Sequence, residues 1–566
     1  MKSIIAWILS SLLLLACDAD RRPDRDLPDT GTDAGTDAGT DADAHTGPTI
    51  PPEWFAPDPL GRTTADNRIE ALPEMIIVSD DELAPAWEEY AVLRSLEGRH
   101  TMVVRMSGIP PQFAGIDDAQ TLQNFLRDQW QRGTLRFVLL GGDAGRVPFR
   151  RVDNAISIPV QGDNYVTNGP SESYFANVEA TWDGDGDGRF GEKDQDFSLA
   201  TAREAQLAVG RVSADTVAEV RNYLNKVVIY RTYIPGYALR SLLLSDVAST
   251  LPVIGDIDAA EGIESTFSAF FPSAFGPHVQ KLYATSTACT MYDAEPTSPG
   301  AVKTALESYV PLVFHNGHGS HRWMTNDIDR DFVEALSNEL PAVFASCSCL
   351  SGNFADVAST ASSPWEAQTP ENDSAGERWI LGRRGGVAYI GNTGTGLGPI
   401  GGSQFLHAFF EGLFAQALPT IGEIFNYARS RMREIPFSLS YLSTVMTDDS
   451  EWWTHHVLIL LGDPSLPVWT QDPLKLELEA PATYGPGYQT ITVTVRVAGG
   501  GTRAGVAVTF HKPGDFRVTV PTDDNGQVSF SFIPRGPEFL HVGASAPDCS
   551  FISGRIAPDL PSEVWP

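Results

Sequence analysis

Cysteine and positive charge are both scarce in this chain of 566 residues. Five cysteines are too few for a disulfide scaffold at this length, so the fold must depend on buried apolar side chains, which make up 42% of the sequence. Lys and Arg number 40 against 72 Asp and Glu, and the formal net charge is −32. An acidic surface repels phosphate backbones, so we expect no nucleic acid partner and consider a divalent cation the better match.

The N-terminal apolar segment is too short to cross a membrane as a helix. Its run from Ile4 to Leu15 follows Lys2, whereas a spanning helix needs about 20 residues. These features predict a signal peptide over residues 1–16. The run ends in Leu-Leu-Ala-Cys at Cys17, which resembles the bacterial lipobox. This resemblance implies a lipid on Cys17 and a cell envelope lipoprotein, in the outer membrane or at the cell surface; the alternative is an ordinary secretory signal.

Residues 17–69 have the composition of a flexible tether. They are rich in Asp, Thr, Gly and Ala, and the tetrapeptide Thr-Asp-Ala-Gly occurs twice. Aromatic and β-branched apolar residues are missing until about Ile50, so burial cannot offset the entropy lost on folding. We therefore predict a disordered tether that holds the folded part away from a membrane.

The region 70–470 alternates short apolar strands with helical patterns. Its β-α-β-α-β start predicts an α/β fold with a parallel sheet covered on both faces. We divide it into an N-terminal subdomain, 70–235, and a catalytic subdomain, 236–470. The expected strands are 75–78, 102–105, 137–140, 240–246, 310–314, 341–346 and 386–390, and the expected helices are 81–97, 120–131, 217–233, 301–309, 331–339, 404–416 and 421–433.

Two of these strands end in residues suited to nucleophilic catalysis. His318 lies in a Gly-His-Gly sequence after strand 310–314, and Cys347 and Cys349 follow strand 341–346. Because parallel strands end at one edge of a sheet, an imidazole there could accept a thiol proton and generate the reactive thiolate. Gly352 would let the cysteine turn aim backbone N–H groups at an oxyanion. The alternative is that His318 only caps a strand and the cysteines are buried.

Two other interpretations of this region are weaker. A zinc site of His315, His318, His321 and the cysteines would need a helix to align histidines three residues apart, and the neighbouring glycines argue against one. The glycine-rich run 391–398 could suggest a dinucleotide loop, but no acidic residue follows in a second strand at the expected interval of about 20 residues. We interpret this run as a wall of the substrate cleft.

The motifs resemble those of the gingipain-type cysteine peptidases over residues 70–470. The resemblance implies a caspase-like fold, an acyl-enzyme mechanism on protein or peptide substrates, His318 as the catalytic histidine and Cys349, three residues before a glycine, as the nucleophile. Cys347 is then a neighbour that could oxidise with Cys349 and block it. The segments that carry the resemblance are Asn316-Gly317-His318-Gly319-Ser320, Cys349-Leu350-Ser351-Gly352-Asn353-Phe354, Val209-Gly210-Arg211, Ile421-Gly422-Glu423 and Leu461-Gly462-Asp463-Pro464-Ser465-Leu466.

One position departs from the family pattern. Family members tend to place an acidic residue before the strand that leads to Gly-Arg, where it can orient the histidine, and this chain has Gln206 there. Glutamine can accept the same hydrogen bond without adding charge. The resemblance therefore implies Gln206 as an orienting residue, with Glu204 as a substitute.

An acidic insert predicts a structural calcium site. Counted from Asp183 as position 1, Asp185 and Asp187 fall at positions 3 and 5, the Arg189 carbonyl at 7 and Asp194 at 12, as in an EF-hand loop. Asp in place of Glu at position 12 would weaken the affinity for calcium. The alternative is a solvated acidic turn.

Residues 471–566 read as an all-β module. Six short runs, 474–478, 490–497, 506–510, 516–520, 528–532 and 539–544, are divided by turn residues and predict an immunoglobulin-like sandwich for spacing or adhesion. The whole sequence then predicts an envelope-anchored cysteine endopeptidase. The alternatives are a transpeptidase or sortase-like attachment enzyme of the same fold and a non-catalytic, calcium-dependent adhesive lipoprotein.

Overall fold

The computed structural model describes residues 72–559 except 161–162, 233–234, 237, 239, 252–254, 272–277, 356–372, 399–400, 435–437, 440–441 and 444–445. The expected signal peptide, the lipid site at Cys17 and the tether lie outside the described residues. Within the described part, no helix has the length and apolar character needed to span a bilayer.

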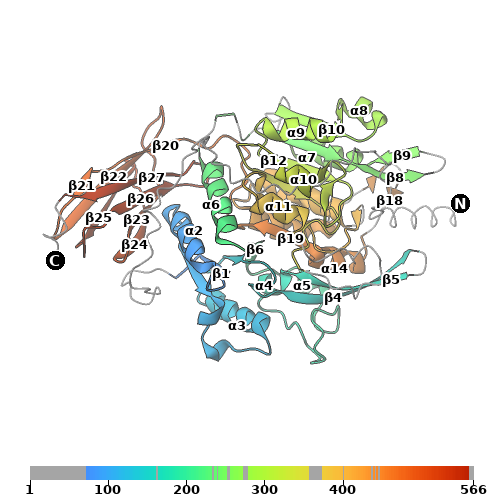
Figure 1. Cartoon of the computed structure of the whole chain (residues 1–566), viewed down its shortest axis with the longest axis horizontal. Coiled ribbons are helices and arrows are strands. Elements are labelled where there is room, and N and C mark those ends of the chain that lie inside the picture. Colours follow the sequence, from blue (N-terminus) through green and yellow to red (C-terminus); the bar gives the residue numbers. More distant parts are fainter. Residues whose placement is uncertain are drawn as a thin grey trace, which may run out of the picture.

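An eleven-stranded sheet forms the centre of the molecule (Figure 1). Its strands lie in the order β11-β10-β7-β12-β15-β16-β19-β6-β3-β1-β2. The bounds are β1 (Met75–Ser79), β2 (Thr101–Arg105), β3 (Phe137–Gly141), β6 (Ala208–Val212), β7 (Ser241–Ser245), β10 (Val279–Tyr283), β11 (Glu295–Pro296), β12 (Leu312–Asn316), β15 (Ala342–Ser346), β16 (Gly386–Asn392) and β19 (Leu458–Gly462).

The sheet reverses direction once. From β11 to β16 all neighbours are parallel, β19 is antiparallel to β16, and from β19 to β2 the pairing is parallel again. The carboxyl ends of β7, β12, β15 and β16 therefore share one edge with the amino ends of β19 and β6. This edge is where ligands of such sheets usually bind.

Helices cover the sheet on both faces. Alternate residues of β1 and β3 enter two separate cores: Met75 and Ile77 pack with helices such as α2 and α6, whereas Ile76 and Val78 pack with α3. The helices of the sheet region are α2 (Ala84–Leu96), α3 (Asp118–Gln131), α4 (Ser173–Ala176), α5 (Leu199–Ala202), α6 (Val217–Arg231), α7 (Ala260–Phe270), α8 (Ser286–Tyr292), α9 (Pro299–Glu307), α10 (Arg330–Glu334), α11 (Ala375–Leu381), α12 (Gly402–Phe410), α13 (Ile421–Arg431) and α14 (Asp448–Val457).

The predicted α/β class with a parallel sheet is confirmed. All seven expected strands of the sheet form, and the expected helices form with shifted ends. The largest differences are in α12, which stops at Phe410 and continues as a π-helix over Glu411–Ala415, and in α10, which stops at Glu334 instead of Glu339. The short edge strands β10 and β11, the strand β19 and the hairpins β4 (Arg150–Val160) with β5 (Asp163–Ser171) and β8 (Val247–Leu251) with β9 (Gly255–Asp258) were not expected as elements.

The C-terminal β module is also confirmed. One sheet has the order β20-β22-β25 and the other β21-β27-β26-β23-β24, and their apolar side chains form a separate core. The bounds are β20 (Leu476–Glu479), β21 (Thr483–Tyr484), β22 (Gln489–Val497), β23 (Ala507–Lys512), β24 (Phe516–Pro521), β25 (Gln527–Phe532), β26 (Leu540–Ser545) and β27 (Ile552–Pro558). The sequence analysis missed β21 and β27.

The C-terminal module packs against the end of α2 (Figure 1). Thr509 Oγ1 donates a hydrogen bond to the Ser95 carbonyl at 2.9 Å, and Arg517 Nη1 donates to Ser95 Oγ at 2.6 Å. A Cβ placed on Gly543 would lie 2.2 Å from the Leu96 carbonyl oxygen. The backbone of β26 therefore touches the backbone of α2, and glycine at 543 is required for that contact.

We expect Gly543→Ala to loosen this contact, since overpacking costs about 1–3 kcal/mol of stability. Differential scanning calorimetry should show a lower Tm. The matched control is Gly554→Ala on the paired strand β27, where the new methyl would meet only Leu478 Cδ2 at 3.5 Å, an ordinary contact. Equal Tm values for the two variants would contradict the assigned role of Gly543.

Candidate active site

The two loops that hold the predicted dyad follow neighbouring parallel strands. His315 of β12 is in register with Ser346 of β15, so His318 and Cys349 each lie three residues beyond a matched pair. Both loops emerge at the edge identified above. The expectation that adjacent strands deliver a histidine and a cysteine to one edge is confirmed.

Glycines allow these loops to touch. A Cβ on Gly319 would lie 2.3 Å from Ser348 Cβ and 3.2 Å from the Cys349 carbonyl oxygen. Such distances are shorter than real Cβ contacts, so only glycine at 319 permits the histidine loop to lie against the cysteine turn. The Gly-His-Gly sequence is therefore a packing requirement as well as a mark of flexibility.

Cys349 is enclosed by the glycine-rich run after β16. The Gly396 N–H donates to Cys349 Sγ at 3.2 Å, and the side chain is only 2% exposed. A donor at this distance favours the thiolate over the thiol.

Cys347 occupies a different environment. It is a free cysteine, and its Sγ donates to the Gly402 carbonyl at 3.2 Å on the side of α12. Burial raises the pKa of the Cys347 thiol far above its usual value. Both cysteines are buried, with Cys347 7% and Cys349 2% exposed, and the Gly396 N–H that donates to Cys349 Sγ distinguishes Cys349 as the better candidate nucleophile. No Cys347–Cys349 disulfide is formed in the structure.

The expectation for the oxyanion donors needs correction. The Leu350 N–H donates to the Gly394 carbonyl at 2.9 Å, and the Gly352 N–H donates to the Asn392 carbonyl at 3.1 Å. Both donors therefore fix the turn to the run after β16 instead of pointing at a substrate. Leu350 has a φ of 56°, an unusual value for a residue with a side chain, and marks a sharp turn directly after Cys349.

Asp246 is the acidic residue beside the histidine loop, and the sequence analysis missed its role. It directly follows β7, and its Oδ2 accepts hydrogen bonds from the His318 backbone N–H at 3.1 Å and from His315 Nε2 at 2.9 Å. The Asp246 residue is 3% exposed and His315 is fully buried. The signal was available, because Asp246 ends an expected strand in the same way as His318 and Cys349.

Gln206 is not brought to the dyad. It precedes β6 at the correct edge, but β15, β16 and β19 separate β6 from β12. Four strand spacings amount to about 19 Å, which is beyond the reach of a glutamine side chain. Its backbone N–H donates to the Ala176 carbonyl at 3.0 Å, and its buried Oε1 has no hydrogen-bond partner among the described residues. An orienting role therefore fits Asp246 better than Gln206.

The zinc interpretation has no support in the described part of the chain. Both nitrogens of His315 are engaged, Nε2 with Asp246 and Nδ1 with Ser346 Oγ at 2.9 Å. In the described ranges, the one cluster of three or more acidic, His or Cys side chains with ligand atoms close enough for a metal is in the acidic insert.

The acidic insert brings together three of the five predicted calcium ligands. Carboxylate oxygens of Asp183, Asp185 and Asp187 lie within 4.8 Å of one another. Asp194 is outside this group; it has a φ of 65° and its N–H donates to the Phe197 carbonyl. The Arg189 side chain pairs with Asp153 at 2.7 Å and with Glu192, and the Arg189 backbone N–H donates to Asp187 Oδ1 at 2.8 Å.

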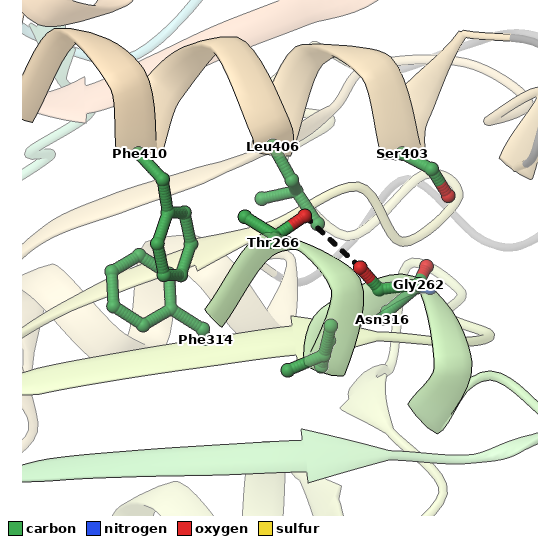
Figure 2. A pocket seen from close by; sticks show the side chains of 8 residues that line it. Gly262, Thr266, Phe314, Asn316, Ser403, Leu406 and Phe410 are labelled. Atoms are coloured by element: carbon green, nitrogen blue, oxygen red, sulfur yellow. Dashed lines mark hydrogen bonds between the residues drawn. The ribbon is translucent and has the colours of Figure 1, made fainter. Parts of the chain in front are cut away.

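A pocket behind the histidine loop is separate from the dyad. Figure 2 shows it between α7, β12 and α12, with Phe314 and Phe410 at one end and Asn316 and Ser403 at the other. Asn316 Nδ2 donates to the Ala259 carbonyl at 3.0 Å, which ties the loop to the start of α7. Neither His318 nor Cys349 is among the residues that line this pocket.

The comparisons with known proteins agree with this geometry. The model of peptidase family C25 matches residues 69–469. The crystal structure of the Arg-specific cysteine proteinase gingipain R aligns with a TM-score of 0.59 at 17% identity, over 86% of this chain and 98% of that chain. A complex of the pro- and mature domains of RgpB from Porphyromonas gingivalis aligns with a TM-score of 0.58, at 17% identity, over 86% and 100% of the two chains.

A third structure, described only as a protease, aligns with a TM-score of 0.59 at 14% identity, over 87% of this chain and 98% of its own. No curated protein sequence matches the chain. At these identities the structural neighbours establish the fold alone. The family match spans well over half of the chain, and it confirms the resemblance drawn from the motifs. The chain belongs to peptidase family C25, the gingipain family of cysteine peptidases.

Proposed function

We propose that the protein is a cysteine endopeptidase with Cys349 as nucleophile and His318 as general base. The observation that carries the proposal is the contact between the Gly-His-Gly loop and the cysteine turn at the shared edge of β12 and β15. Family membership implies protein substrates, and the Gly396 N–H on Cys349 Sγ favours the reactive thiolate.

The chemistry follows from these two side chains. In the reduced enzyme, His318 takes the Cys349 proton, and the thiolate attacks the carbonyl carbon of the scissile peptide bond. The imidazolium returns its proton to the leaving amine, which leaves an acyl-enzyme, and water releases the acyl group. Asp246 holds the loop of His318 through its backbone N–H and places a negative charge near the imidazolium that forms.

We expect Cys349→Ala and His318→Ala to lower kcat at least about 10³-fold, because each removes a group that takes part in bond making. The matched control is Cys347→Ala, which removes a buried thiol of high pKa and should retain most activity. Cleavage of a peptide library by the reduced full-length protein gives the measurement and the preferred residue before the scissile bond. Activity in Cys349→Ala together with its loss in Cys347→Ala would reverse the assignment.

The same acyl-enzyme could be resolved by an amine. Incubation of a cleaved peptide with an excess of a glycine amine, followed by mass spectrometry, separates the two outcomes. A dominant joined product would replace the endopeptidase by a transpeptidase, and the hydrolysed product alone supports the proposal. If none of the three variants changes peptide turnover, the adhesive lipoprotein is the better explanation.

We also propose that the enzyme is held at the cell envelope by a lipid on Cys17. The support is the lipobox-like sequence and the tether, which together would leave the sheet edge free to meet large substrates. Fractionation of producing bacterial cells should place the protein with membranes and release a Cys17→Ala variant. Mass spectrometry of the N-terminal peptide should show the acyl chains. If the wild type and the Cys17→Ala variant were found with membranes to the same extent, the proposed lipid anchor would be wrong.

The acidic insert is proposed as a structural calcium site. Its support is the meeting of three carboxylates within 4.8 Å, an arrangement whose repulsion a cation would relieve. The insert lies over a buried aromatic group, since Trp182, Phe190 and Phe197 belong to the same core as Val209 of β6. Calcium there would hold the insert on the sheet and would take no part in bond cleavage.

Calcium should raise the Tm by mass action, and a chelator should lower it. The variant Asp185→Ala/Asp187→Ala should lose the response to calcium. The matched control is Glu477→Ala/Glu479→Ala, which removes two exposed carboxylates at the same spacing from β20. Calorimetry of the three proteins with and without calcium is the measurement. If calcium still raised the Tm of the Asp185→Ala/Asp187→Ala variant, the insert would be interpreted as a solvated acidic turn and not as the calcium site.

A further inference from the structure

A buried chain of hydrogen bonds joins the histidine loop to the cysteine turn. It starts at Asp246 and passes through both nitrogens of His315 to Ser346 Oγ. Ser346 Oγ lies 2.8 Å from Ser348 Oγ and accepts from the Ser348 backbone N–H at 3.1 Å. Ser348 directly precedes Cys349, so the chain ends at the nucleophile.

The far end of this chain is equally well fixed. Ser348 Oγ lies 3.1 Å from both Ser351 Oγ and Tyr389 OH, and Tyr389 OH donates to Ser351 Oγ at 2.7 Å. His315, Ser346, Ser348, Ser351 and Tyr389 are fully buried. Water therefore cannot replace a lost member without a change in packing, and removal of one link would take a hydrogen bond from each of its neighbours.

The requirements of each group define the role of His315. An ionised carboxylate only accepts hydrogen bonds, so His315 Nε2 must carry the proton that it shares with Asp246. His315 Nδ1 can then accept from the Ser346 hydroxyl. The Asp246 oxygen that binds His315 also accepts from the His318 N–H. The His315 ring thus sets the position of the Asp246 carboxylate, which holds the His318 backbone, and of Ser346, which contacts the cysteine turn.

We propose that His315 is a positioning residue of the peptidase, which holds the loops of His318 and Cys349 at reacting distance through Asp246 on one side and Ser346 on the other. The inference rests on the proposed function of Cys349 and His318 and names a device within it. The histidine loop lies so close to Asp246 and His315 that their positions determine its own. A Cβ on Gly317 would lie 2.5 Å from Asp246 Oδ2 and 2.7 Å from His315 Nε2. The loop rests directly on this pair.

The test replaces the two nitrogens one at a time in the reduced full-length protein. His315→Gln keeps a donor near the Nε2 position, His315→Asn keeps a polar group near the Nδ1 position, and His315→Phe keeps neither. Since misplacement of reacting groups by about 1 Å can cost 10²-fold in rate, we expect His315→Phe to lower kcat by about 10²-fold while KM changes less than about twofold. The Gln and Asn variants should each recover part of kcat.

A second readout does not need a peptide substrate. The rate of Cys349 alkylation by iodoacetamide, followed by mass spectrometry, reports the thiolate that His318 sustains. We expect the rate to fall about tenfold in His315→Phe. The control for loss of a buried histidine is His541→Phe in the C-terminal module. The His541 residue is 2% exposed, and its replacement should leave kcat and the alkylation rate unchanged.

The outcomes separate the inference from the proposed function. A folded His315→Phe protein with wild-type kcat and wild-type alkylation overturns the positioning role. If His315→Phe does not fold, Ser346→Ala is the deciding variant. Its control is Ser241→Ala, which removes a buried hydroxyl of β7 that has no hydrogen-bond partner in the described residues. A lower alkylation rate in Ser346→Ala than in Ser241→Ala supports the positioning role, and equal rates overturn it. If Cys349→Ala cleaves peptides as the wild type does, the proposed function fails, and the alkylation rates still judge the role of His315.

Discussion

The parallel pairing of β12 with β15 is the constraint on which the candidate active site depends. Parallel neighbours end at one edge, so one register, His315 opposite Ser346, fixes the starting points of both loops. A slip of one residue would move His315 out of reach of Ser346 and turn the strand side chains to the opposite face. The glycines at 317 and 319 then convert this register into direct contact between the loops.

The reversal of the sheet at β19 places the Gly-Asp-Pro-Ser motif, which follows this strand, at the edge opposite the candidate active site. Asp463, at the end of β19, is fully buried and accepts from Tyr90 OH at 2.7 Å and from the Ser465 N–H at 2.7 Å. Its carboxylate also pairs with Arg94 of α2 at 3.0 Å. The Gly-Asp-Pro-Ser sequence thus joins the last strand to the first helix, far from the catalytic edge. It is a structural motif, whereas Gly-His-Gly belongs to the site.

The sequence was sufficient for seven strands of the central sheet and seven of its helices, because buried parallel strands are continuous apolar runs. The positions of His318 and Cys349 after two of these strands led to the proposed dyad. The sequence could not identify the side chain that supports the histidine, since strand order in space decides that question and sequence order does not. Gln206 and Asp246 each lie beside a strand at the same edge, and only the adjacency of β7 to β12 selects Asp246.

Two cysteines separated by one residue show how the backbone assigns different chemistry to equal side chains. Cys347 still follows the direction of β15 and faces α12, where burial suppresses ionisation. Two residues later the turn has reversed, and Cys349 meets the Gly396 N–H. Ser348 between them points into the buried hydrogen-bond chain. The alternation of a strand would place residues 347 and 349 on one face, so the turn at Leu350 and the run after β16 separate their roles.

That hydrogen-bond chain is hard to explain by stability alone. Buried polar groups can often be replaced by apolar ones of similar size with little loss of stability, and the strands around them are otherwise aliphatic or aromatic. Hydrogen bonds differ from apolar contacts in having fixed directions and lengths. A histidine, three serines and a tyrosine therefore give the two loops one relative position, where an apolar core would permit several, and the peptide-bond cleavage proposed for His318 and Cys349 requires one.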